Sequence, residues 1–126
     1  MAKDLAQIER LEALLADCHN EWEQLAALEA YLEEQLDFPF RGVCDLAPVP
    51  GSYGIGQGDR VKVLGFLDSD QRWGVMVRVQ MGQRFYRCPL FRIKPNGLTP
   101  SQMTAVGDYR AWFLAVGLPE IVEFDE

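Results

Sequence analysis

Residues 58–95, GDRVKVLGFLDSDQRWGVMVRVQMGQRFYRCPLFRIKP, decide the fold of this chain of 126 residues. Apolar and polar residues alternate in two runs, with Val61 and Val63 on one face of the first run and the valines 75, 77 and 79 on one face of the second. Such alternation is typical of β-strands that have one buried face. Between the second run and a third, Met81-Gly82-Gln83 has a glycine suited to a tight turn. The stretch therefore predicts an antiparallel meander.

A meander this short usually closes into a small barrel. Its exit, the PL-x-x-I-x-P pattern of residues 89–95, is similar to that of SH3-like barrels. Upstream, residues 41–46 alternate again and predict a first strand, whereas residues 48–58 are rich in Pro, Gly and Ser and predict a loop. We therefore expect about five short strands between Arg41 and Pro95.

Helical spacing replaces strand alternation on both sides of the predicted barrel. The N-terminal stripe predicts helix over residues 3–36 through Leu5, Ile8, Leu11, Leu15, Trp22, Leu25, Leu28, Leu32 and Leu36. Asn20 with Glu23 has the spacing of a capping box, so one continuous helix and a helix pair broken near Cys18 both remain open. Pro39 ends this region, and residues 105–116 predict a final helix. The predicted fold is α+β: a small SH3-like antiparallel β-barrel flanked by a long N-terminal helix (or helix pair) and a C-terminal helix.

Charge is segregated along the chain, whose net charge is −7. Residues 1–40 carry two bases and ten acids, residues 41–98 nine bases and four acids, and residues 99–126 one base and five acids. With a pI near 4.7, nucleic acid is not an expected partner. Neither a run of apolar residues long enough to span a bilayer nor a basic, apolar leader is present. We therefore predict a cytoplasmic protein without a membrane partner.

If the N-terminal helix is continuous, its first segment extends beyond the barrel. That segment would then expose the apolar stripe formed by Leu5, Ile8, Leu11 and Leu15. An exposed stripe of this kind favours self-association. The sequence thus predicts a homodimer formed through the N-terminal helix.

Acidic residues gather where the N-terminal helix is expected to end. Glu33, Glu34 and Asp37 lie at its C-terminus, where free carbonyl groups already carry negative potential. Carboxylates and carbonyls together form half of a site for a hard cation, although a solvated acidic face explains the same residues. Asp68 and Asp70 add carboxylates from the turn between two strands. Because Arg72 and Trp73 stand where an EF-hand needs a ligand and a glycine, this loop is not an EF-hand.

The order and spacing of several motifs resemble the CcbP-type, non-EF-hand calcium-binding family. The motifs are LEEQLDFPFRGVCDL (32–46), GDRVKVLGF (58–66), WGVMVRVQMGQRFYRCPLFRI (73–93) and DYRAWF (108–113). The resemblance implies a helix–barrel–helix domain over residues 20–118, preceded by a helical extension (1–19) and followed by an acidic tail (119–126). It implies Ca²⁺ binding or buffering through surface carboxylates and no enzymatic activity. The candidate ligands are Asp37, Glu33, Glu34, Asp68 and Asp70.

A second class of function stays open from the residues alone. SH3-like barrels bind proteins through exposed aromatic side chains, and such a groove has candidates in Tyr53, Trp73, Phe85, Tyr86 and Phe91. The alternative prediction is therefore a scaffold or protein-interaction module without a metal. No set of nucleophile and base and no cofactor-binding loop is present in the sequence, so neither prediction includes catalysis.

Overall fold

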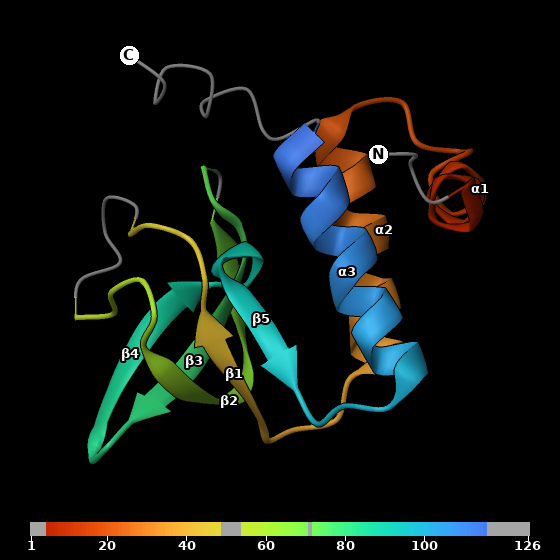
Figure 1. Cartoon of the computed structure of the whole chain (residues 1–126). Coiled ribbons are helices and arrows are strands. Elements are labelled where there is room, and N and C mark those ends of the chain that lie inside the picture. Colours follow the sequence, from red (N-terminus) through yellow and green to blue (C-terminus); the bar gives the residue numbers. More distant parts are fainter. Residues whose placement is uncertain (1–4, 49–53, 71, 116–126) are drawn as a thin grey trace.

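A computed structural model describes residues 5–48, 54–70 and 72–115 of the chain. Its helices are α1 (Leu5–Leu14), α2 (Glu21–Gln35), the short 3₁₀ helix η1 (Leu90–Arg92) and α3 (Pro100–Ala115). Its strands are β1 (Phe40–Cys44), β2 (Arg60–Asp70), β3 (Gly74–Met81), β4 (Arg84–Pro89) and β5 (Ile93–Asn96). Figure 1 shows α2 and α3 side by side against the sheet, with α1 seen end-on beyond them. The α+β class is confirmed.

The described strands form one antiparallel sheet in the order β4-β3-β2-β1-β5. Val61, Val63 and the three valines of β3 are buried as predicted, although Met76, on the opposite face of β3, is buried as well. Gly82 has φ of 64° in the turn between β3 and β4, as its place in the sequence predicted. The described part of the chain therefore has five strands, as expected, although the first begins at Phe40 and ends at Cys44.

The sheet is strongly curled but not closed. The Sγ atoms of Cys44 on β1 and Cys88 on β4 are 3.9 Å apart, whereas three strand spacings in a flat sheet are about 14 Å. Register shifts in β2 increase the bend. The edge strands β4 and β5 are not paired with each other in the order of the described strands. The closure predicted for an SH3-like barrel is consequently not confirmed.

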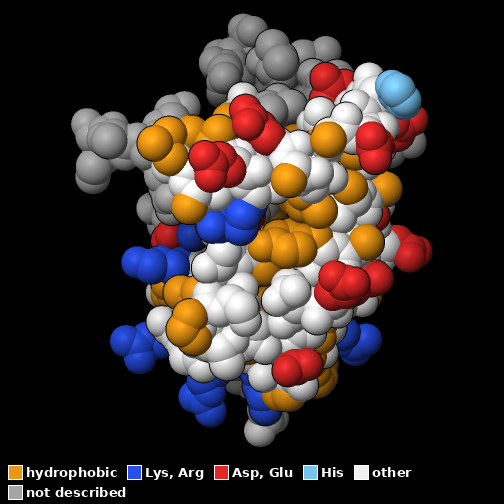
Figure 2. Space-filling view, turned by 90° about the vertical axis from the view of Figure 1, so that its right-hand side faces the viewer, with side chains coloured by type: hydrophobic (Ala, Val, Ile, Leu, Met, Phe, Trp, Pro, Cys, Tyr) orange, Lys and Arg blue, Asp and Glu red, His pale blue; other side chains and the backbone are white. Residues whose placement is uncertain are grey.

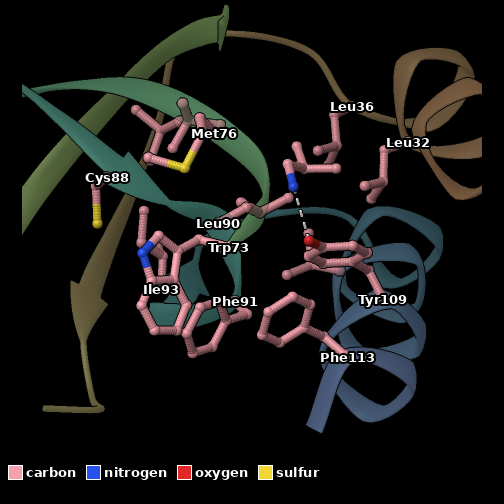
Figure 3. Close-up of a cluster of buried hydrophobic side chains, with 14 of the residues drawn as sticks. Leu32, Leu36, Trp73, Met76, Cys88, Leu90, Phe91, Ile93, Tyr109 and Phe113 are labelled. Atoms are coloured by element: carbon pink, nitrogen blue, oxygen red, sulfur yellow. Dashed lines mark hydrogen bonds between the residues drawn. The ribbon is translucent and has the colours of Figure 1, made fainter. Parts of the chain in front are cut away.

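The core lies between the sheet and the helices α2 and α3. As predicted, Leu25, Leu28, Leu32 and Leu36 are buried, but Trp22 leaves the stripe and is 41% exposed. Figure 3 shows side chains from η1 and α3 meeting over the sheet. The ring centroids of Phe91 and Phe113 are 4.3 Å apart, and the buried hydroxyl of Tyr109 accepts a 2.9 Å hydrogen bond from the Val75 amide.

Helix α3 begins five residues before the predicted start. The Thr99 hydroxyl accepts a hydrogen bond from the Gln102 amide, and the Gln102 side chain accepts one from the Thr99 amide. Pro100 fills the first helical position, which suits a residue without an N–H. Together these residues form a capping box that the prediction missed. The predicted end at Val116 and the tail 119–126 lie outside the described residues.

Two helices, not one continuous rod, form the N-terminal region. The chain turns after Leu14, and α2 starts at Glu21 with Asn20 as its cap, whose side chain accepts the Glu23 amide at 2.9 Å. Helix α1 folds back so that Leu11, Leu14 and Leu15 pack against the core. Of the two alternatives, the helix pair is confirmed, and the protrusion expected for a continuous helix does not occur, although Leu5 is 71% exposed.

A buried carboxylate on α3 anchors α1. Asp108 is 1% exposed and accepts two 2.9 Å hydrogen bonds from Arg10 and 3.1 Å bonds from Gln7 and Tyr31. Residues from α1, α2 and α3 thus meet at one side chain. None of the described helices combines the length and apolarity required to cross a bilayer.

Candidate metal centre

Three carboxylates, the acidic line, follow one another along the chain at the C-terminal end of α2, the third just beyond the helix. Glu29, Glu33 and Asp37 are spaced by four residues each, which places the two glutamates one above the other on the helix surface. Because Asp37 follows Leu36, whose backbone is extended, this helical spacing applies to Glu29 and Glu33 and not to Asp37. Helix geometry therefore pairs Glu29 with Glu33, and within the described residues these three side chains are not grouped to hold one metal ion.

Glu29 is the member of this line that the motifs of the sequence did not single out. Its carboxylate accepts a hydrogen bond from the Ser69 hydroxyl at the end of β2, which ties α2 to the sheet. Burial raises the pKa of Glu29 above its ordinary value, and the charge of Glu33 raises it further. The pair thus holds mutually repelling negative charge that a cation would relieve. Its position four residues before Glu33 was the available signal.

Asp37 lies directly after Leu36, the residue that caps the C-terminus of α2. Its side chain is exposed, and its Oδ2 accepts a 3.3 Å hydrogen bond from the side-chain amide of Gln102. Gln102 belongs to the first turn of α3, where the helix dipole is positive. The N-terminus of α3 therefore offsets part of the unfavourable potential that the end of α2 creates at Asp37.

Asp70 has a structural role in the turn between β2 and β3. Its Oδ1 accepts the backbone amides of Arg72 and Trp73 at 2.7 and 3.0 Å, and its Oδ2 lies 3.8 Å from the guanidinium of Arg87. Asp68, two residues earlier, is exposed, as is Glu34 on α2. Neither of these two makes an ion pair within the described residues.

The five predicted ligands do not converge on one point. In the part of the chain that the structure describes, no group of three or more His, Cys, Asp or Glu side chains is arranged to hold a metal ion. On the face in Figure 2, acidic side chains spread over the upper and right-hand parts, and most basic ones lie along the left and lower edges. The arrangement offers pairs of oxygen ligands, which suit a hard cation that completes its shell with carbonyls and water.

A comparison with protein families matches residues 9–113 to the CcbP family model, whose description is calcium binding. The match includes most of α1, the whole sheet and most of α3. The chain belongs to the CcbP family of calcium-binding proteins. The resemblance stated from the sequence motifs is thereby confirmed.

Two solved structures share the fold of this CcbP-family chain. One is described as a calcium-binding protein in the calcium-binding form, and the other is the crystal structure of CcbP from Anabaena. Each superposes with a TM-score of 0.72 at 23% identity over 94% of this chain, covering 98% of the first structure and 96% of the second. Among curated proteins, none matches the chain significantly.

The aromatic residues of the alternative scaffold prediction are divided between core and surface in this CcbP-family chain. Trp73 and Phe91 are buried and belong to the hydrophobic core. Tyr86 is partly buried, and Phe85 is 52% exposed with the guanidinium of Arg78 5.1 Å from its ring centroid. The remaining candidate, Tyr53, lies outside the described residues. Two of the five aromatics are thus committed to packing.

Proposed function

We propose that this chain binds Ca²⁺ through the carboxylates that line α2, with Asp37 and Glu33 as its principal ligands. Membership of the CcbP family carries the proposal. The location is supported by Glu33, which lies one helical turn after Glu29 and four residues before Asp37. Both side chains are exposed, so neither has to be released from the core before it binds an ion.

Calcium takes six to eight oxygen ligands, which exceeds what two carboxylates supply. Free carbonyl groups at the C-terminus of α2 and water complete the proposed shell. The carboxylates of Glu34 and Asp68 contribute only if they move toward Asp37 and Glu33. Asp70 contributes only if it gives up its hydrogen bonds to the turn. A shell assembled from so few fixed ligands predicts a dissociation constant on the order of 10⁻⁴ M, typical of weak sites.

Calorimetry and thermal unfolding with CaCl₂ or chelator test the site. At a hundredfold excess of Ca²⁺ over its dissociation constant, a ligand that binds only the folded state adds about 2.7 kcal/mol to the free energy of unfolding. We expect wild type to show this gain, and Asp37→Asn and Glu33→Gln to lose most of it. Glu12→Gln, which removes the same charge from an exposed position on α1, should retain it.

The outcomes separate the ligand assignment from the function. Equal melting temperatures of wild type with Ca²⁺ and with chelator would refute calcium binding. A gain that survives in Asp37→Asn and Glu33→Gln but disappears in Glu29→Gln would instead move the site to the junction of α2 with β2.

We also propose that the protein is non-enzymatic and cytoplasmic and that it has no nucleic-acid or membrane partner. We also propose that the curled sheet is related to SH3-like barrels. The proposed division of the chain is an extension (1–19), a domain (20–118) and a tail (119–126). The proposal also retains the homodimer through the N-terminal helix, for which the exposed Leu5 offers support. Sedimentation of the full chain at high micromolar concentration tests the dimer, and a monomer there would refute it.

A further inference from the structure

A groove with basic walls crosses the outer face of the sheet, on the side of β1 that faces away from the core. Its volume is about 650 Å³, and it is lined by β1, β2, the end of β3 with the turn after it, and the end of β5. Its cationic side chains are those of Arg41, Arg60 and Lys62. Among the described residues that line it, none is acidic. The volume is within the usual range for small-molecule sites.

Strand register explains why these side chains lie together. Arg41 is the cross-strand partner of Asn96 on one side and of Lys62 on the other, and Lys62 is in turn the partner of Gln80. Partners in neighbouring antiparallel strands point to the same face, so four polar side chains form a row across β5, β1, β2 and β3. In the next row, Lys94 and Arg60 flank Val43. The cations of both rows are exposed.

No described acid balances the positive charges of this row. Directly opposite like charges, as in Arg41 and Lys62, destabilise a sheet. Within the described part of the chain, none of Arg41, Arg60, Lys62 and Lys94 forms an ion pair with an acid. An anion in the groove would relieve this repulsion, and guanidinium groups bind phosphate oxygens in a two-pronged manner.

The charge of the whole chain restricts the size of such an anion. With a net charge of −7, and with two bases against ten acids in the N-terminal 40 residues, the protein repels a long polyanion that extends beyond the groove. A compact anion that concentrates its charge over three cations avoids that repulsion. We propose that this groove binds a compact ligand that carries two or more phosphate groups. This site is separate from the proposed calcium ligands on α2.

Calorimetry with inorganic tripolyphosphate and with ATP, at low salt and in the presence of EDTA, tests the groove. EDTA is required because polyphosphates bind Ca²⁺, and it makes the result independent of the calcium site. We expect binding that weakens as salt is added, and at least a fivefold loss of affinity in Arg41→Gln and in Lys62→Gln. Preference for one probe distinguishes a nucleotide from free polyphosphate, and both support the shared chemistry.

Arg72→Gln is the matched control, because it removes one positive charge at the opposite end of β3, about 26 Å from the groove by strand length. Its affinity should remain within twofold of wild type. No binding of either probe at millimolar concentration, or an equal loss in Arg72→Gln and Arg41→Gln, would overturn the proposal. Tighter, groove-dependent binding of a dT20 oligonucleotide would also overturn it and assign the face to nucleic acid.

Discussion

Replacing Asp108 by asparagine tests how the N-terminal helix is held. The carboxylate is 1% exposed and accepts hydrogen bonds from Gln7 and Arg10 on α1 and from Tyr31 on α2. Asparagine keeps the shape of the side chain but removes its charge. It also places an amide N–H₂ donor where the donors of Arg10, Gln7 and Tyr31 already point, so at least one of the hydrogen bonds from Arg10 is lost.

The size of the effect follows from the burial of the two partners. A hydrogen bond to a charged group contributes about 1.5–3 kcal/mol, and two such bonds join Arg10 to Asp108. Arg10 is 41% exposed, so water compensates part of its loss. Detachment of α1 limits the total cost, because it returns both groups to solvent. We expect Asp108→Asn to lower the free energy of unfolding by about 2 kcal/mol.

Urea unfolding followed by tryptophan fluorescence measures this loss, and hydrogen exchange shows where it acts. The amides of α1 should exchange faster in Asp108→Asn, while those of β3 change only with global stability. Asp17→Asn, which removes the same charge from an exposed turn, should leave both measurements unchanged. Unchanged urea midpoint and α1 exchange in Asp108→Asn would refute the anchoring role.

Three further predictions concern the core and the acidic line. Gly74→Ala should lower the free energy of unfolding by well over about 2 kcal/mol, because Gly74 has φ of 74° and a Cβ there overlaps the Tyr109 hydroxyl. Gly82→Ala, with φ of 64° and open space around it, should lower it by about 1–2 kcal/mol. Equal urea midpoints of the two variants would contradict this difference. Tyr109→Phe leaves the buried Val75 amide without its acceptor and should cost about 1–3 kcal/mol in urea unfolding, and a neutral result would show that another acceptor replaces it. Glu29→Gln should stabilise the chain at pH 7. Burial and the neighbouring charge of Glu33 raise the pKa of Glu29 in the folded state. Glu29 therefore contributes to the free energy of unfolding below its unfolded pKa, and this contribution is lost as pH rises through the folded pKa. That gain should vanish near pH 4, and a gain independent of pH would contradict the cause.

The local pattern of apolar and polar residues predicted much of the fold. Alternating valines predicted β2 and β3, the leucines at helical spacing predicted the buried face of α2, and Gly82 predicted the turn after β3. The motifs from residue 32 to residue 113 also pointed to the correct family, which the match over residues 9–113 confirms. These features are readable because each depends on residues that are close in sequence, where periodicity decides which face is apolar.

Contacts between distant residues were decided by the tertiary structure. The sequence showed an apolar stripe on α1 but not that Asp108, 98 residues after Arg10, would draw the helix back. It showed Glu33 and Asp37 but not that Ser69 would bind Glu29, nor that the curled sheet would remain open between β4 and β5. The basic groove likewise depends on register, which brings Arg41 between Asn96 and Lys62. Periodicity determines which side of each element is apolar, whereas the choice of partner depends on the shape and charge of the surfaces that meet in space.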